Sequence, residues 1–197
     1  VGLLSSNVEH VTLAPPAPGQ AAAPLPQPYT IINLGNQAYA CTLDVSRLTV
    51  ADPEFASVFL WLSSLSDKDT VRISFANSRG IQEYVLCLPL LNTIMLCGAK
   101  TIAVIDKMML GLDCYHVMAC KAVEVSEFSL FGIPSVLPAE TSRLSERDEA
   151  IVTSAHTLLL NARDNLHIIT DADIADLESR KAVYIQPAEL IARVQQG

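Results

Sequence analysis

Hydrophobic and polar residues change their spacing repeatedly from about residue 29 onward, and the two spacings that recur are those of strands and helices. The run YTIINLG, residues 29–35, is rich in β-formers and ends at a glycine. The next segment predicts a helix, because large apolar residues recur at helical spacing: Phe55, Val58, Phe59 and Leu62. Asp52 followed by Pro53 is a typical helix start. We therefore expect a strand and then a helix.

The same succession continues through the middle of the chain. TVRISFANSRG, residues 70–80, predicts a strand that ends in a polar turn, and IQEYVLCLPLLNTIMLCGAK, residues 81–100, predicts a helix. Pro89 would cost a helix interior roughly 3 kcal/mol unless the helix kinks or begins late. Next we expect a strand over 101–106, a turn at 107–109 and a second helix.

The C-terminal part predicts further elements of both kinds. AVEVSEFSLFGIPSV, residues 122–136, indicates one or two strands. A long helix is expected over about 146–165, with an apolar stripe at Ile151, Leu158, Leu159 and Leu166. A short helix, a strand near Val183–Ile185 and a terminal helix from Pro187 follow. The fold class is therefore α/β, with repeated β-α units, a mostly parallel sheet and a long C-terminal helix.

The first 28 residues differ from the rest. LAPPAPGQAAAPLPQP, residues 13–28, is rich in proline and contains no charged residue. Proline fixes φ and lacks a backbone donor, so this segment is unsuited to a helix or a sheet interior. Two interpretations stay open: a disordered tail, or an extended arm that contacts a neighbouring subunit or a protein partner. We divide the chain into this arm (1–28), a head (29–139) and a C-terminal helix with its closing segment (140–197).

Composition narrows the classes of function. Half of the residues are hydrophobic and 17% are charged, which suggests that apolar surface lies in an interface. The longest apolar run contains Pro89 and Asn92 and is too short to cross a bilayer, and no secretory signal is visible. A net charge of −8 with scattered basic residues disfavours nucleic acid as a partner. We expect a cytoplasmic protein, or one within a viral particle.

The cysteines and histidines give no clear metal or cofactor site. Five cysteines without Cys-x-x-Cys spacing indicate free, buried thiols in a reducing compartment. Cys114 and His116 are two positions apart on a predicted helix and point to different faces, so one ion cannot easily use both. We interpret them as a core thiol and a helix-surface imidazole, and we expect no metal and no cofactor.

Three segments, taken in order, resemble the ClpP family of barrel-forming proteolytic subunits, within the ClpP/crotonase fold. IINLGN resembles the first core strand of the family, and DTVRISFANSRGIQEYV resembles the strand and turn that supply oxyanion donors. TIAVIDKMMLGLDC resembles the strand and elbow that carry the serine nucleophile. The resemblance runs from about Ile31 to the C-terminus. The helix from Glu146 then resembles the handle that interleaves two rings.

The residues that this resemblance aligns with catalytic positions differ from those of the family. At the oxyanion turn one glycine, Gly80, is kept, and Ile81 takes the next position. With Gly111 matched to the closing glycine of the elbow, the serine position is Met109. EFSLFGIPS, residues 127–135, resembles the strand that carries the histidine of the family, and with Pro134 matched to the family proline, the histidine position is Gly132. A thioether has no proton to lose and cannot form an acyl intermediate, so the resemblance implies a degenerate site.

Three functional hypotheses follow from the resemblance. The first is a catalytically inactive ClpP-like subunit with a structural, scaffolding or regulatory role, forming a ring with itself or with a ClpP-like paralogue. Such a ring would be heptameric or a double ring. The second is an active ClpP-type serine endopeptidase with a displaced nucleophile, for which Cys114, Ser126, Ser129 and Ser135 are the candidates. The third is a crotonase-like acyl-CoA binder, which Ile81 and the lack of a basic cluster disfavour.

Overall fold

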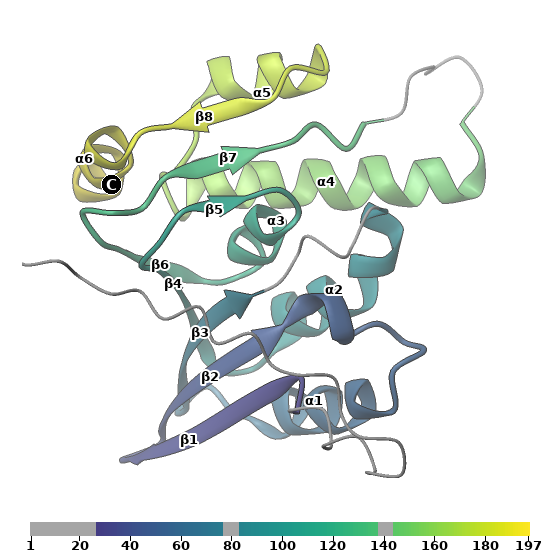
Figure 1. Ribbon diagram of the computed structural model, residues 1–197, viewed down its shortest axis with the longest axis vertical. Helices are drawn as coiled ribbons and strands as arrows, with labels where there is room; N and C mark the ends of the chain where they lie inside the picture. The colour runs from purple at the N-terminus through teal and green to yellow at the C-terminus, as the bar shows by residue number, and fades with distance from the viewer. Residues whose placement is uncertain (1–26, 77–82, 138–143) are drawn as a thin grey trace, which may run out of the picture.

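The computed structural model describes residues 27–76, 83–137 and 144–197, and it arranges them around two β-sheets (Figure 1). Sheet A has five strands in the order β1-β2-β3-β4-β6, and sheet B has three in the order β5-β7-β8. The strands of sheet A are β1 (Tyr29–Gly35), β2 (Ala38–Asp44), β3 (Thr70–Ala76), β4 (Lys100–Ile105) and β6 (Ala122–Val125). Those of sheet B are β5 (Met109–Leu110), β7 (Phe131–Ile133) and β8 (Val183–Ile185).

The helices follow the strands in the succession that the sequence predicts. They are α1 (Pro53–Ser64), α2 (Leu88–Leu96), α3 (Asp113–Met118), α4 (Glu146–Asp164), α5 (Asp171–Glu178) and α6 (Pro187–Gln196). Short 3-10 helices lie at Val45–Arg47 and Tyr84–Cys87. Strands β2, β3, β4 and β6 pair in parallel, as repeated β-α units require, so the predicted fold class is confirmed.

Strand β2 is an element that the sequence analysis did not predict. It pairs antiparallel with β1 in a hairpin whose two turn residues, Asn36 and Gln37, have φ values of 50° and 60°. Two consecutive positive φ values are typical of the tight turn that suits the right-handed twist of a hairpin. The hairpin makes β1 the edge of sheet A.

Local signals explain the bounds of two helices. Helix α1 begins where expected, because Asp52 accepts a hydrogen bond from the N–H of Glu54 at 3.0 Å and Pro53 occupies the first turn. Helix α2 begins late, which resolves the difficulty posed by Pro89. The 3-10 helix Tyr84–Cys87 precedes it, and Pro89 lies in its first turn, where the missing N–H costs nothing.

The long helix α4 is confirmed and packs against α3 (Figure 1). Its buried residues include Leu158 and Leu159. The side-chain amide of Asn161 donates to the carbonyls of Met118 at 2.6 Å and Cys120 at 3.0 Å, which ties α4 to the end of α3. Within the three described ranges, no helix combines the length and the apolar character needed to cross a membrane.

The C-terminal segment completes the fold. The chain returns after α5, and β8 pairs antiparallel with β7, matching Phe131 with Ile185. Residues from the expected head and from the C-terminal segment thus share sheet B. The two expected domain boundaries, near residues 28 and 139, stay predictions. The arm up to residue 26 and the segment 138–143 lie outside the described residues.

Candidate functional site

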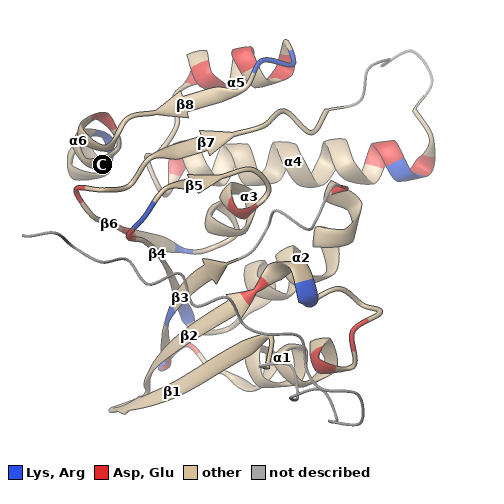
Figure 2. Cartoon of the chain, in the orientation of Figure 1, with Lys and Arg blue, Asp and Glu red and all other residues tan. Residues whose placement is uncertain are grey.

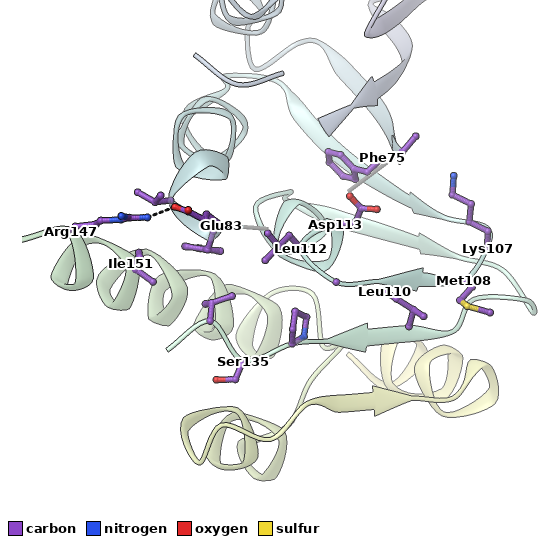
Figure 3. A pocket seen from close by; sticks show the side chains of 16 residues that line it. Phe75, Glu83, Lys107, Met108, Leu110, Leu112, Asp113, Ser135, Arg147 and Ile151 are labelled. Atoms are coloured by element: carbon purple, nitrogen blue, oxygen red, sulfur yellow. Dashed lines mark hydrogen bonds and ion pairs between the residues drawn. The ribbon is translucent and has the colours of Figure 1, made fainter. Parts of the chain in front are cut away.

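A cavity of about 890 Å³ opens between the two sheets (Figure 3). Its walls come from the end of β3, the 3-10 helix before α2, the segment around β5 and the start of α3, the end of β7, and the first turns of α4. The residues that line it are Phe75, Ala76, Glu83, Tyr84, Val85, Lys107, Met108, Leu110, Gly111, Leu112, Asp113, Pro134, Ser135, Val136, Arg147 and Ile151. Its volume is within the range of small-molecule sites.

Most of the lining residues are apolar, but polar atoms contribute as much of the cavity surface as apolar atoms do. Glu83 and Arg147 form an ion pair that links the segment before α2 to the start of α4, and both side chains are more than half exposed (Figure 3). An ion pair so exposed contributes little to stability. Tyr84 packs edge-on against Tyr115 at 5.0 Å between ring centroids, and its hydroxyl lies 2.9 Å from Oγ of Ser154. The cavity therefore has a firm aromatic wall on this side.

The elbow between β5 and α3 brings the backbone up to the cavity. Gly111 has a φ of 92°, a conformation that L-residues rarely adopt, and its N–H donates to the carbonyl of Gly132 at 3.0 Å. Leu112 and Asp113 follow directly at the start of α3. The turn expected at 107–109 lies elsewhere: Met109 and Leu110 form β5, and the chain enters the helix at Asp113. A two-residue strand is too short to produce a recognisable pattern.

Met109, which the resemblance places at the nucleophile position, lies in the core. It is 2% exposed, pairs with Phe131 in β7, and donates its N–H to the carbonyl of Leu130 at 2.7 Å. The residues on either side of it, Met108 and Leu110, line the cavity instead, as alternation along a strand requires. Met109 is therefore a packing residue in the structure.

Gly132, at the expected histidine position, also serves packing. A Cβ at this residue would lie 2.4 Å from Cδ2 of Leu110 and 3.0 Å from the ring of Tyr184. The missing side chain thus leaves room for two large neighbours across sheet B. Gly80 and Ile81, the expected oxyanion turn, lie outside the described residues.

Cys114 is not an available nucleophile. It is fully buried, and its Sγ donates to the carbonyls of Gly132 at 3.2 Å and Met109 at 3.5 Å. Burial raises the pKa of this thiol well above its ordinary value, and the neighbouring Asp113 raises it further. The expectation of a core thiol is confirmed here, and all five cysteines are free and buried.

The candidate serines are engaged elsewhere. Ser135 reaches the cavity margin, but its hydroxyl donates to the carbonyl of Leu177 at 2.7 Å. The hydroxyl of Ser129 donates to the carbonyl of Ile105, and the N–H of Ser126 donates to that hydroxyl at 3.0 Å. Neither Ser126 nor Ser129 lines the cavity.

His116 differs most from its expectation. We interpreted it as a helix-surface imidazole, but it is 0% exposed and lies behind Phe75, 5.5 Å away between ring centroids. Its Nδ1 lies 3.2 Å from the carbonyl of Leu112, so the neutral ring donates from Nδ1. Its Nε2 has no hydrogen-bond partner among the described residues. Burial lowers the pKa of His116 to about 4, against a smaller opposing effect of the Leu112 carbonyl.

The cavity therefore brings together apolar side chains, backbone at the start of a helix, the exposed Glu83–Arg147 ion pair, and the charged residues Lys107 and Asp113. In the described part of the chain, no group of three or more His, Cys, Asp or Glu side chains is placed to hold a metal. Sequence reasoning missed Tyr84, Glu83 and Arg147 as wall residues, because they come from segments that only the tertiary fold brings together. No local motif marks any of them.

Comparison with known proteins identifies the fold. No protein-family model and no curated protein matches the sequence. An enoyl-CoA hydratase from Bacillus anthracis is similar in structure, with 12% identity and a TM-score of 0.56 over 86% of this chain and 69% of that chain. A monofunctional enoyl-CoA isomerase from M. smegmatis has 14% identity and a TM-score of 0.54, over 85% of this chain and 74% of that chain. A methylmalonyl-CoA decarboxylase has 9% identity and a TM-score of 0.54, over 85% of this chain and 64% of that chain. At such identities the likeness establishes the ClpP/crotonase fold and nothing narrower.

Proposed function

We propose that this chain is a non-catalytic member of the ClpP/crotonase fold that acts as a subunit of an oligomer, with a structural, scaffolding or regulatory role. One observation carries the proposal. Among the described residues, the cavity at the β5–α3 elbow brings no hydroxyl or thiol nucleophile together with a base. Covalent acyl transfer needs both groups within hydrogen-bond reach. The nearest candidates, Ser135 and Cys114, use their polar atoms to hold the backbone.

The surface supports a role in assembly. Several large hydrophobic residues are strongly exposed in the described part of the chain: Ile32, Leu34, Val50, Phe59, Leu60, Leu86, Leu96, Met108, Phe128, Leu160 and Tyr184. Helix α1 carries one charged residue, Glu54, and α2 carries none. Helices with so little charge and with exposed Phe59, Leu60 and Leu96 suit a subunit interface better than a solvated face. A ring of this chain, alone or with a ClpP-like paralogue, and either heptameric or double, belongs to this proposal.

A fluorophosphonate probe tests the lack of serine-type covalent catalysis. We expect no covalent labelling of the folded protein, because none of the candidate serines in the described residues is activated by a base. Labelling would be read by intact mass, with an active serine peptidase as the positive control and heat-denatured protein as the negative one. A stoichiometric adduct on one serine of the folded protein, with none on the heat-denatured control, would contradict the proposal. That result would favour the peptidase with a displaced nucleophile.

The size and lining of the cavity favour a second candidate function, the binding of an acyl-CoA-like ligand without turnover. Eleven of the sixteen lining residues are apolar or glycine, Lys107 and Arg147 add positive charge, and the structural neighbours reported above are named for reactions of CoA esters. We expect a medium-chain acyl-CoA to raise the melting temperature, since a ligand at 100 times its Kd stabilises by about 2.7 kcal/mol. Free CoA is the control for binding through the nucleotide alone.

A matched pair of variants locates such binding. Ile151→Trp would fill the cavity from α4, while Leu160→Trp adds the same bulk on the exposed side of the same helix. The acyl-CoA shift should vanish in the first variant and persist in the second. No shift with the wild-type protein, or an equal shift in both variants, would eliminate this second candidate.

A further inference from the structure

Within the described residues, the outer edge of β1 is an unpaired strand edge. β1 pairs only with β2 in sheet A, so its other side offers unpaired backbone groups within the described residues. Natural proteins usually guard such edges with charged residues, proline or a covering segment. Tyr29–Gly35 contains no charged residue and no proline, and Ile32 and Leu34 are 54% and 55% exposed. Figure 2 shows β1 free of both signs of charge.

The other strand edges in the described fold are better guarded. At the far edge of sheet A, Glu124 of β6 forms an ion pair with Arg72, and α6 contacts this strand. In sheet B, Arg180 and Lys181 lie within three residues of the start of β8, and β5 consists of two residues. β1 is therefore the longest edge and the one with least protection.

We propose that β1 pairs antiparallel with β1 of a second copy of this chain across a two-fold axis at Ile32. This inference rests on the oligomeric role proposed above and names one of its surfaces. In that register Ile32 faces its own equivalent, and Thr30 faces the partner's Leu34. Alternation places Ile32 and Leu34 on the same face, so four aliphatic side chains of the two copies come together. The pairing joins two five-stranded sheets into one continuous sheet.

Charge and strand length favour a second copy of this chain as the partner that pairs with the edge of β1. The chain carries a net charge of −8, so most contacts between two copies meet electrostatic repulsion. An uncharged strand avoids local repulsion. Pro28 on one side and the turn at Asn36 and Gln37 on the other limit the ladder to the strand itself. An isologous contact between identical strands fits this short, self-complementary segment.

Directed cross-linking tests the register. In Ile32→Cys the two introduced thiols face each other across the axis, at a Cα separation typical of opposed residues in an antiparallel pair, which a disulfide can span. Oxidised glutathione should convert this variant mainly to a covalent dimer. Val50→Cys is the control, because Val50 is 66% exposed but lies outside β1, and the native cysteines are all buried. Equal cross-linking of both variants, or none in Ile32→Cys, would overturn the proposal.

Mass measurement separates this inference from the proposed function. Ile32→Lys/Leu34→Lys should reduce the native mass to half that of the wild type, while Val50→Lys should not. An oligomeric wild type whose mass is unchanged by the double substitution would refute the β1 contact and leave the oligomeric role standing. A wild type of 21.3 kDa at working concentrations would refute both. If the chain's own N-terminal arm covers the β1 edge, the protein will be monomeric and Ile32→Cys will not cross-link. That result also refutes the contact between two copies.

Discussion

The protein is expected to lose roughly 2–3 kcal/mol of its free energy of unfolding between pH 7 and pH 4.5 through His116 alone. Burial lowers the pKa of this histidine from 6.5 to about 4 in the folded state. Below pH 6.5 the unfolded chain therefore binds a proton that the folded chain refuses, and stability falls until the pH reaches about 4. The cause is structural: a proton on Nε2 would place a charged N–H where the described residues offer no acceptor.

Denaturant unfolding at the two pH values, in wild type and His116→Leu, measures this effect. The variant loses the hydrogen bond to Leu112 at both pH values, but its stability should depend less on pH by roughly 2–3 kcal/mol. His156→Leu is the matched control, because His156 lies on α4 with its side chain 45% exposed. An unchanged pH dependence in His116→Leu would mean that the imidazole is not buried as described.

Phe131→Ala should destabilise the protein by about 3–5 kcal/mol. Phe131 is 0% exposed and stands at the centre of sheet B, paired with Met109 on one side and Ile185 on the other. Its removal would leave a cavity under three strands that are each only two or three residues long. Such short strands have few other contacts with which to compensate, so little relaxation is expected.

Phe128→Ala is a close control for this prediction. Phe128 lies three residues earlier, is 71% exposed, and loses little contact on truncation. Chemical denaturation should show a large loss for the first variant and less than about 1 kcal/mol for the second. Similar losses in both would show that sheet B does not depend on the Phe131 core.

The sequence predicted the fold better than the site, and particular residues show why. Helix starts at Asp52, Pro53 and Pro187 are local signals and appear where expected. The hairpin strand β2 was missed although Gly35 followed by Asn36 is a known turn signal, because AYACTLD mixes small and polar residues. The burial of His116 depends on Phe75, which lies in β3, far from His116 in the sequence but next to it in the fold. The periodicity of a helix cannot reveal such a contact.

The candidate site residues were placed by alignment to a family pattern. Such a pattern determines neither how deeply a side chain is buried nor which way it points. Met109 and Gly132 were expected at an active site and are instead found in the packing of sheet B. The cavity walls come from five segments that meet only after folding. Side chains such as Tyr84 and Arg147 therefore had no local signal that sequence reasoning could use.

The pairing of β8 with β7 has a consequence for synthesis in the cell. Phe131 reaches its neighbour Ile185 only after nearly the whole of the described C-terminal segment has been translated. Until then the nascent chain presents Phe131 and Ile133 on an open strand edge, which is the kind of surface that chaperones bind and that promotes aggregation. A ribosome stalled before Val183 would therefore carry a polypeptide whose first sheet can form but whose second cannot close.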